Sequence, residues 1–384
     1  MKGEQSFDFA RKLICDIIFM KNHKQNNMFF GEKGEDMLVK REFIGETKQE
    51  TPIYGYNIKN SNGMEICVMN FGANIRNIFV PDKDGNKVDV VLGYEDYQRY
   101  FENPESFGAL VGPVANRTAG AAFTIDGNEY HIEVNEGVNN LHSHSQNGFQ
   151  KCMWDTQENE DGVTFTITAK DGELGFPGNR TMTVTYSLSE NNELMIHYHA
   201  TSDKKTIFNP TNHTYFNLSG HKSGTVLNHE LKLNASNYTP AREDSIPTGE
   251  IASVKGTPFD FLETKTIGKD IHSDNEQLHI TGGYDHNFCI DDADGSLRQF
   301  AILSSNDTGI KMHCSTTLPG FQLYSANFLK GVDGKDGAFY NIQDGICLET
   351  QCYPNSINTP GFPNTVFGPE NDYDSVTVFQ IETE

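Results

Sequence analysis

The feature of this sequence that most constrains its fold is a series of short segments in which apolar and polar residues alternate. Residues 163–168, 182–188 and 376–379 are clear examples. Alternation with a period of two places the apolar side chains on one face of a β-strand. Turn-forming dipeptides separate these segments: Asn62-Gly63, Asp84-Gly85, Asp126-Gly127, Asp171-Gly172 and Asp333-Gly334. Glycines at such turns supply the positive φ angles that hairpins need.

These segments predict an all-β fold. The chain has 384 residues, enough for two or three ordinary domains or for one large β domain. Few segments carry a helical period, and residues 94–101 are the clearest short helix. Many short strands with few crossover helices favour a large antiparallel β-sandwich over alternating βα units. Because no internal repeat, low-complexity tract or linker follows residue 40, we expect a single domain over residues 39–384.

Residues 1–38 differ in texture from the rest of the chain. Phe9, Leu13, Ile17 and Met20 recur every three or four residues, which is typical of one face of an amphipathic helix. A polar stretch rich in Lys, Asn and Gln follows. Two interpretations of this N-terminal extension stay open, a short helix or a disordered tail. We assign it no function.

The charge balance and the cysteines limit partners and location. The 30 Lys and Arg against 53 Asp and Glu give a net charge of −23, which disfavours binding to nucleic acid phosphates. No stretch of about 18 apolar residues could span a bilayer. Seven cysteines, an odd number without a CxxC pair, indicate free thiols in a reducing compartment. Asp16 interrupts the apolar residues 13–20, and no small-residue cleavage site follows, so the sequence predicts a cytoplasmic protein.

Five short segments concentrate polar residues that the packing of a β-sandwich does not require. The first places Asn116 and Arg117 in a run of small and apolar residues. The planar guanidinium group of Arg117 is suited to binding hydroxyl or carboxylate groups. An arginine in such a run is also commonly salt-bridged for structural reasons. The segment alone does not separate the two interpretations.

The second segment contains a His-x-His pattern formed by His142 and His144. On an extended strand this pattern places both imidazoles on one face, which would allow a metal site in a cupin-like barrel. Such a site needs a carboxylate a few residues further on, whereas the sequence continues with Ser, Gln and Asn. We therefore predict no metal centre here.

The third and fourth segments each contribute a histidine. His213 lies among amides and aromatic residues in 209–218, where it could act as an acid or a base near neutral pH. A lone histidine is, however, commonly structural. In the fourth segment Asp285 precedes His286 between aromatic residues that could contact a ligand face. An Asp soon after a glycine is commonly a turn residue.

The fifth segment is an alternating run, residues 345–354. Its period of two places Glu349 on the strand face opposite Leu348. If that face lines a cleft, a partly desolvated Glu349 becomes a general base whose pKa the surroundings can tune. If it faces solvent, Glu349 is an ordinary surface carboxylate.

The combined set suits a neutral polyol as ligand. Carboxylates, amides, imidazoles and a guanidinium group bind hydroxyls, while aromatic rings contact the C–H face of a sugar. The sequence contains no GxxxxGK loop, no GxGxxG opening a βα unit, no GxSxG elbow and no HExxH motif. Phosphoryl transfer and cofactor-dependent redox chemistry therefore lack their usual sequence support.

In their order along the chain, these segments resemble the motifs of the aldose 1-epimerases, or galactose mutarotases. The resemblance covers most of residues 40–384. It rests on Asn116-Arg117, Asn140-Leu141-His142 with Gly148-Phe149 and Trp154, residues 211–218, residues 283–286, residues 319–322 and residues 348–351. For the fold, it implies a large antiparallel β-supersandwich with an open cleft.

For the chemistry, the resemblance implies interconversion of the α and β anomers of a free hexose without metal or organic cofactor. Glu349 would remove the proton of the C1 hydroxyl while His213 protonates the ring oxygen, and the ring would close again by the reverse transfers. The substrate-binding residues carried over are Asn116, Arg117, His142, Asp285 and Gln322. The preferred aldose and the oligomeric state stay open.

Two positions depart from the common family pattern. Ser143-His144 stands where the family commonly has Gly-Gly, so we expect an altered loop or sugar preference. Asn355 stands where an Asp is common, and we expect this to affect a turn more than the chemistry. The alternatives are an epimerase of a phosphorylated hexose, which needs extra cationic groups, and a non-catalytic sugar-binding protein. A metalloenzyme that uses His142 and His144 is a third.

Overall fold

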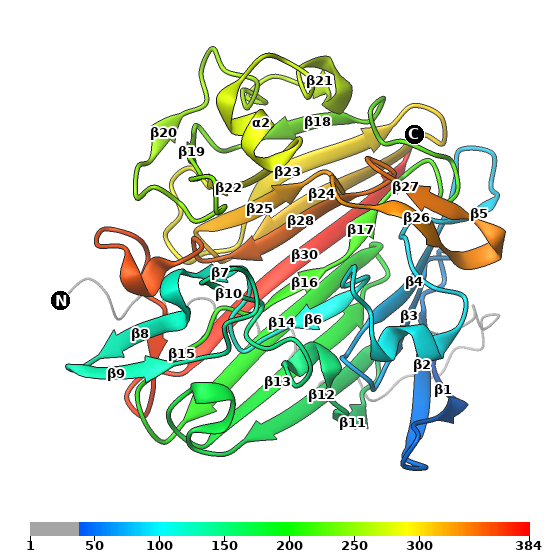
Figure 1. Cartoon of the computed structure of the whole chain (residues 1–384). Helices are drawn as coiled ribbons and strands as arrows, with labels where there is room; N and C mark the ends of the chain where they lie inside the picture. Colours follow the sequence, from blue (N-terminus) through cyan, green and yellow to red (C-terminus); the bar gives the residue numbers. More distant parts are fainter. Residues whose placement is uncertain (1–37) are drawn as a thin grey trace, which may run out of the picture.

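The structure is a computed structural model that describes residues 38–384 (Figure 1). The predicted N-terminal extension, residues 1–38, therefore lies outside the described residues except for Leu38, where strand β1 begins. Every named strand pair in the described residues is antiparallel, which confirms the predicted all-β, antiparallel class. None of the helices found in residues 38–384 combines the length and the apolar character that crossing a membrane requires.

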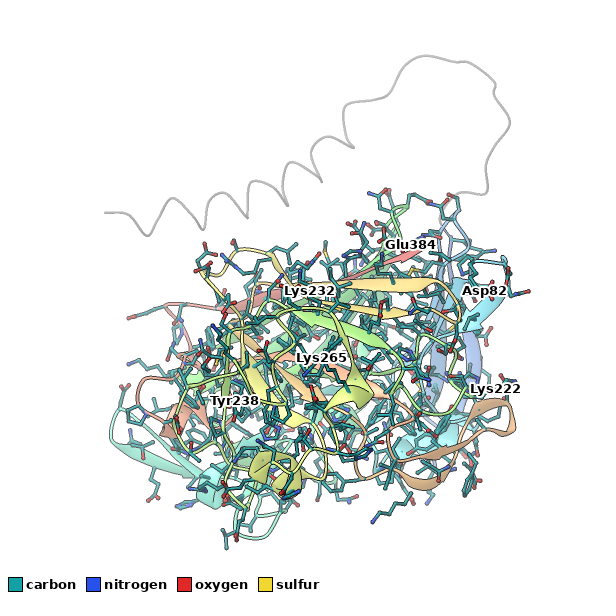
Figure 2. The ribbon with its side chains drawn as sticks, turned by 90° about the horizontal axis from the view of Figure 1, so that it is seen from above. Asp82, Lys222, Lys232, Tyr238, Lys265 and Glu384 are labelled. Carbon is teal, nitrogen blue, oxygen red and sulfur yellow. The ribbon has the colours of Figure 1, made fainter. Side chains whose placement is uncertain are left out.

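The largest sheet has nine strands and forms one layer of the molecule (Figure 1). Its strands in spatial order are β11 (Asp155–Glu158), β12 (Gly162–Ala169), β13 (Arg180–Leu188), β14 (Glu193–Ser202), β30 (Tyr373–Thr383), β24 (Ile310–Thr316), β23 (Arg298–Ser305), β18 (Glu230–Leu233) and β21 (Lys265–Thr266). Seen from above, Lys232 and Lys265 come from β18 and β21 at one edge of this sheet (Figure 2). The predicted strands 163–168, 182–188 and 376–379 lie in β12, β13 and β30.

Two further sheets complete the main architecture. A six-stranded sheet has the order β17 (Tyr215–Phe216), β28 (Ile346–Gln351), β25 (Gly320–Tyr324), β22 (Asp285–Cys289), β19 (Asn237–Thr239) and β20 (Ala252–Ser253). A five-stranded meander contains β1 (Leu38–Glu46), β2 (Pro52–Lys59), β3 (Glu65–Met69), β4 (Ile75–Pro81) and β5 (Lys87–Asp89).

Five two-stranded ladders connect these sheets. They pair β7 (Arg117–Thr118) with β10 (Asn140–Leu141), β6 (Ala109–Val111) with β16 (Thr211–His213), β15 (Thr206–Ile207) with β29 (Val366–Phe367), β8 (Ala122–Ile125) with β9 (Asn128–His131), and β26 (Lys330–Asp333) with β27 (Phe339–Asn341). The 3-10 helices are η1 (Tyr97–Phe101), η2 (Ala119–Ala121), η3 (Phe149–Lys151), η4 (Glu173–Gly175), η5 (Ile267–Lys269), η6 (Lys335–Gly337) and η7 (Ser356–Asn358).

The helix predicted over residues 94–101 is shorter than expected. It is the 3-10 helix η1, which begins at Tyr97 because the side chain of Asp96 caps it by accepting from the backbone N–H of Gln98. Sequence reasoning missed the one α-helix of the described residues, α2 (Glu276–Thr281). Asn275 at its N-cap and Gly282 at φ 71° after its end are ordinary helix signals that could have revealed it.

The turn predictions hold at four of five sites. Gly63, Gly85, Gly127 and Gly172 have φ between 79° and 86°. At the fifth, Gly334 has an ordinary φ of −107°, and the hairpin between β26 and β27 turns instead through Asp336 and Gly337. The connection there is longer than the Asp-Gly dipeptide suggested, so the positive φ angles fall later in the chain.

Aromatic side chains join the six-stranded sheet to the nine-stranded sheet. Phe321 on β25 packs on Phe300 of β23 with ring centroids 4.5 Å apart, and Phe216 on β17 packs on Phe379 of β30 at 5.1 Å. These residues and Leu348 belong to one continuous buried cluster. Burial of this apolar surface is the main force that holds the two sheets together. The other face of the six-stranded sheet is thereby free to form a polar site.

Candidate functional site

Neighbouring strands β22, β25 and β28 form the floor of the candidate site (Figure 1). Gln322 lies directly opposite Glu349 across the β25–β28 pair. On β28, Leu348 faces the core while Glu349, only 2% exposed, points to the opposite face. The predicted alternation is thus confirmed, and the interpretation of Glu349 as a solvent-exposed carboxylate is wrong.

His213 reaches the same floor from a different ladder. It ends β16, whose pairing with β6 sets it opposite Ala109. Its Nε2 atom lies 3.6 Å from Oε1 of Glu349, and both side chains are almost fully buried. The ring of Tyr215 lies 5.1 Å from the His213 ring between centroids. The structure therefore brings together the predicted acid and base, which are 136 positions apart in sequence.

His142 lies beside this pair, with its ring centroid 5.6 Å from that of His213 at an interplanar angle of 80°. The backbone N–H of Asn116 donates to His142 Nδ1 at 3.1 Å, and the N–H of His142 donates to the carbonyl of Asn116 at 3.0 Å. These two bonds join the loops that carry two of the predicted sugar-binding residues. Among residues 38–384, Nε2 of His142 makes no hydrogen bond.

The premise of a His-x-His metal site is wrong. Strand β10 ends at Leu141, and His142 and Ser143 adopt left-handed φ angles of 57° and 67°, so the pattern does not lie on an extended strand. His144 Nδ1 instead lies 3.5 Å from Oε2 of Glu133. The two imidazoles therefore have different surroundings, and His144 does not join the cluster around His213.

Ser143 has a left-handed backbone conformation, with a φ of 67°. A left-handed φ favours glycine, and the side chain present here offsets part of that strain with two hydrogen bonds. Ser143 Oγ donates to the carbonyl of Val114 and accepts from the Val114 N–H, at 2.7 and 2.9 Å. Its hydroxyl is therefore used to hold the loop before Asn116. Asn355 acts similarly, because its Oδ1 accepts from the N–H of Ala119, as expected for a turn residue.

Arg117 is held by a carboxylate that sequence reasoning did not single out. Its Nε and Nη2 atoms donate to the two carboxylate oxygens of Glu136 at 2.6 and 2.8 Å. Burial alone would lower the pKa of Arg117, but Asp285, Glu136 and Glu349 together raise it. The structural interpretation of Arg117 is thus confirmed, since it is salt-bridged to Glu136, and the carboxylates of Asp285 and Glu349 lie close enough to raise its pKa.

A relay of amides orients the carboxylate of Asp285. Gln351 donates from Nε2 to Oε1 of Gln322 at 3.2 Å, and Gln322 donates from Nε2 to Oδ1 of Asp285 at 2.6 Å. Asp285 begins strand β22 and is not a turn residue. His286 points to the other face of β22, where its ring lies 4.6 Å from that of Phe259. The adjacent Asp and His therefore do not act as a pair.

Burial dominates the electrostatics of the floor. It lowers the pKa of His213 to about 4 and, with help from His213 and Arg117, lowers the pKa of His142 well below its usual value. Burial and the nearby Asp285 raise the pKa of Glu349, while Arg117 opposes this rise. Burial also raises the pKa of Asp285, against Arg117 and Gln322. Burial thus disfavours the charged forms of His213, His142, Glu349 and Asp285.

Three polar atoms on the floor have no hydrogen-bond partner among the described residues: Glu349 Oε2, Gln351 Oε1 and Asn287 Nδ2. A buried polar atom without a partner costs about 1–3 kcal/mol. The floor is therefore prepared for a ligand that supplies both donors and acceptors, as sugar hydroxyls do. The roles of Gln351 and Asn287 were not predicted from sequence, although both occupy the alternating positions that face the site.

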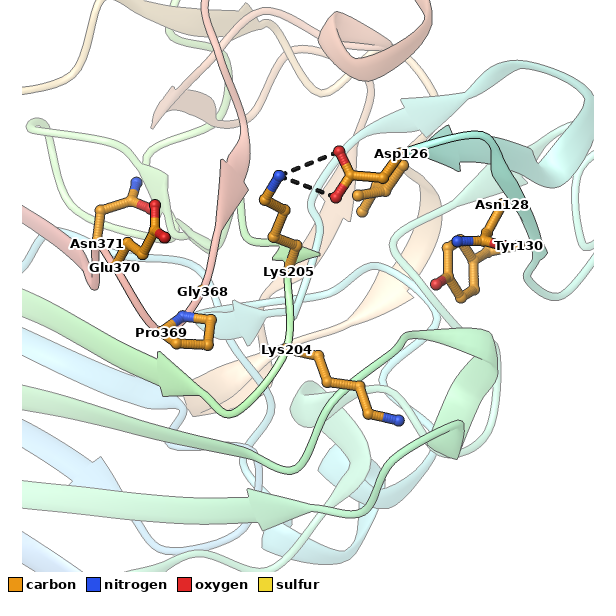
Figure 3. A pocket seen from close by; sticks show the side chains of 10 residues that line it. Asp126, Asn128, Tyr130, Lys204, Lys205, Gly368, Pro369, Glu370 and Asn371 are labelled. Atoms are coloured by element: carbon orange, nitrogen blue, oxygen red, sulfur yellow. Dashed lines mark hydrogen bonds and ion pairs between the residues drawn. The ribbon is translucent and has the colours of Figure 1, made fainter.

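A separate hollow lies away from this cluster. A cavity of about 340 Å³ is bounded by the β8–β9 hairpin and by residues 204–205 and 368–371 (Figure 3). Lys205 points to Asp126 there, with Nζ 2.9 Å from Oδ2, and Lys204 pairs with Asp171. Both lysines are thus already paired, and none of the seven predicted site residues lines this cavity.

Comparisons with known proteins agree with this geometry. The family model described as Aldose 1-epimerase matches residues 54–380. A galactose mutarotase from Bos taurus is 39% identical over 322 residues, covering 84% of this chain and 92% of that protein. Among solved structures, an aldose epimerase homologue from C. elegans superposes with a TM-score of 0.79 at 29% identity, covering 85% of this chain and 98% of the other. A galactose 1-epimerase from Lactobacillus acidophilus superposes with a TM-score of 0.78 at 28% identity, covering 90% and 99%. The predicted resemblance is confirmed, and the chain belongs to the aldose 1-epimerase family.

Proposed function

We propose that this protein is an isomerase that interconverts the α and β anomers of a free hexose, galactose or glucose. The observation that carries the proposal is the buried pair formed by Glu349 and His213, 3.6 Å apart on the polar floor. The names of the relatives, galactose mutarotase and galactose 1-epimerase, support the same activity. We further propose that Asn116, Arg117, His142, Asp285 and Gln322 bind the sugar.

The reaction starts from the tautomer of the pair in which His213 carries the proton and Glu349 is ionised. Glu349 accepts the proton of the C1 hydroxyl while His213 Nε2 donates its proton to the ring oxygen, and the C1–O5 bond breaks. Rotation about C1–C2 then exposes the other face of the aldehyde. Ring closure reverses both proton transfers, so both residues return to their starting states.

The burial of the pair favours ring opening. Before the transfer, the pair carries two opposite charges, and after it Glu349 and His213 are both neutral. Because desolvation raises the pKa of Glu349 and lowers that of His213, the ion pair from which the reaction starts is the less favoured state of the two residues, and the proton transfers to and from the sugar neutralise both. The positive charge of Arg117 opposes the rise in the pKa of Glu349, so that the carboxylate can still ionise and act as a base.

An epimerase of a phosphorylated hexose is less well supported. A phosphate dianion calls for cationic groups beyond those that hold the sugar. Arg117 already makes two hydrogen bonds to Glu136, and Asp285 and Glu349 add negative charge to the floor. A non-catalytic sugar-binding role is disfavoured because both the acid and the base are present.

Polarimetry of freshly dissolved α-D-galactose and α-D-glucose tests the proposal. The assay uses a weakly catalytic buffer with EDTA and compares the wild type with Glu349→Gln, whose amide cannot accept the C1 proton. We expect the substitution to reduce turnover roughly 1,000-fold or more, with an unchanged circular dichroism spectrum. Absence of acceleration by the wild type with either sugar would contradict the proposal. Near-normal turnover of the variant would remove Glu349 from the mechanism.

For the location, we propose the cytoplasm. The six cysteines among residues 38–384 are all free thiols, which supports a reducing compartment. Fractionation of cells that express the tagged full chain tests this proposal, and recovery of the protein outside the cytoplasmic fraction would contradict it.

A further inference from the structure

One group of three metal-ligating side chains occurs in the described part of the chain. It contains His213, Cys347 and Glu349, whose ligand atoms, one from each residue, lie within 4.8 Å of one another. Cys347 Sγ lies 3.7 Å from Nδ1 of His213, and Glu349 Oε1 lies 3.6 Å from Nε2 of the same ring. The proposed reaction uses two of these groups and leaves the thiol without a role.

The strand geometry explains why the three groups converge. Cys347 and Glu349 are two positions apart on β28 and therefore share one face. Cys347 lies directly opposite Tyr324 on β25 and Tyr215 on β17. The ring of His213 approaches this face from β16. Two strands thus supply one sulfur, one nitrogen and one oxygen donor to the same small volume.

This donor set matches the preferences of zinc and cadmium. Zn²⁺ takes Cys sulfur at about 2.3 Å and His nitrogen at about 2.0–2.1 Å, and sites with three protein ligands keep a fourth position open. A thiolate also selects such soft ions over Mg²⁺ and Ca²⁺. Ligand atoms around a tetrahedral ion lie about 3.3–3.6 Å apart at these bond lengths, whereas the three donors here spread over up to 4.8 Å. Only one of the two His213 nitrogens can bind the ion, so side-chain rotation has to draw in the other donors by up to about 1.5 Å.

The charges around the group favour a cation. Glu349 and the neighbouring Asp285 carry carboxyl groups, and Arg117, the cation beside them in the described part of the chain, is paired with Glu136. Glu349 Oε2 is buried and has no hydrogen-bond partner among residues 38–384. A divalent ion would satisfy that oxygen and favour the ionised form of the buried Glu349 carboxylate.

We infer that His213, Cys347 and Glu349 form a binding site for a thiophilic divalent cation, Zn²⁺ or Cd²⁺, and that the bound ion excludes the sugar. On binding, the S–H bond of Cys347 is replaced by a metal–sulfur bond, and its proton passes to solvent without any change of oxidation state. His213 binds as the neutral imidazole and Glu349 as the carboxylate. Exclusion of the sugar rests on the proposed function, whereas binding of the ion does not.

Titration of the full chain with Cd²⁺ tests the site directly, because a cadmium–thiolate bond absorbs in the ultraviolet. We expect saturable absorption at one equivalent of metal in the wild type. Both Cys347→Ser and Cys347→Ala should lose this absorption and weaken binding by about 100-fold or more. The two substitutions of this one thiol differ in size and polarity, and circular dichroism melting checks that each variant is folded.

Two control variants separate this site from others. Cys152→Ser removes a half-buried thiol that donates to the backbone carbonyls of Asn147 and Gly148. His197→Ala removes a surface imidazole that lies 3.1 Å from Asp374, beside His199. Neither change should alter the Cd²⁺ absorption. Loss of the signal in Cys152→Ser, or its retention in both Cys347 variants, would overturn the assignment.

Mutarotation kinetics test the second half of the inference. We expect Zn²⁺ to raise KM for galactose without lowering kcat, EDTA to reverse the effect, and His197→Ala to respond like the wild type. Inhibition that lowers kcat at unchanged KM would refute competition with the sugar. If the wild type shows no mutarotase activity but binds Cd²⁺ through Cys347, the proposed function fails and the metal site stands.

Discussion

The carboxylate of Glu136 accepts two hydrogen bonds, of 2.6 and 2.8 Å, from the guanidinium group of Arg117, which lies 19 positions earlier in the sequence. Such a two-pronged contact fixes the plane of the guanidinium group as well as its position. Only 12% of the Arg117 side chain is exposed, against 34% for Glu136. The carboxylate therefore lies at the rim and holds the arginine toward the floor, where the sugar is proposed to bind.

Removing this hold should weaken sugar binding. Glu136→Gln keeps the shape of the side chain but loses the charge, so Arg117 becomes free to turn toward Asp285 and Glu349. We expect KM to rise about tenfold, which corresponds to about 1.4 kcal/mol, with a smaller change in kcat. Steady-state polarimetry over a range of galactose concentrations measures both. Glu129→Gln, at an exposed carboxylate on β9, is the matched control. An unchanged KM would show that Arg117 needs no anchor.

The amide relay predicts a strong effect when the hydrogen-bond donor of Gln322 is replaced by an acceptor. In Gln322→Glu, an acceptor replaces the donor that lies 2.6 Å from Asp285 Oδ1, so two carboxylates would face each other. One of them must take up a proton or turn away. We expect kcat/KM to fall about 100-fold, or about 2.7 kcal/mol. The exposed Gln299→Glu on β23 serves as control. A kcat/KM within a factor of about two of the wild-type value would mean that Asp285 does not depend on the relay.

His142 and His144 should behave very differently despite their proximity in sequence. His142→Ala removes a ring that lies 5.6 Å from that of His213, and we expect kcat/KM to fall about 100-fold. His144→Ala removes only contacts with Glu133 and with the turn that follows, and we expect a change of less than about threefold. Polarimetry of the two variants side by side measures the contrast. A large fall in kcat/KM in His144→Ala, together with release of metal, would support the metalloenzyme hypothesis instead.

The difference between these histidines also shows how far sequence reasoning reaches. Alternation on β28 correctly placed Glu349 opposite Leu348, because a strand face is set by a period that local sequence displays. The same rule failed at His142, because left-handed φ angles after Leu141 end the strand and no residue type there announces them. The prediction of an all-β fold rests on many alternating segments, so an error in one segment does not change it. The prediction of a site rests on single residues, so one such error changes it.

Contacts between distant loops were beyond local patterns. The bond between Arg117 and Glu136 depends on how the chain turns through residues 118–135, and nothing in the spacing of the two residues specifies it. The order of the motifs predicted Asp285 and Gln322 as site residues, but it did not predict that Gln322 donates a hydrogen bond to Asp285. The amide relay became visible only with the register of β22, β25 and β28.

A buried ion pair away from the site yields a prediction about stability. Lys335 Nζ lies 2.6 Å from Oδ2 of Asp89, and both side chains are less than 8% exposed. Burial lowers the pKa of Lys335, while Asp89 opposes the shift. Removing the amine alone leaves a buried carboxylate without a counter-charge, which typically costs about 3–5 kcal/mol.

We therefore expect Lys335→Met to lower the free energy of unfolding by about 3 kcal/mol, and Lys335→Met combined with Asp89→Asn to recover most of that loss. The amide of the double variant needs no counter-charge, and its oxygen can still accept the hydrogen bond that Asp89 Oδ1 receives from the N–H of Ile78. Asn77, whose Nδ2 donates to Asp89 Oδ2, then has to turn its amide so that its oxygen accepts from the new NH2 group. Urea unfolding followed by circular dichroism measures all variants, with the slope of the transition checked for constancy. If the double variant is no more stable than Lys335→Met, the loss stems from the missing packing of the lysine side chain and from its bond to the carbonyl of Arg76, not from an unpaired charge.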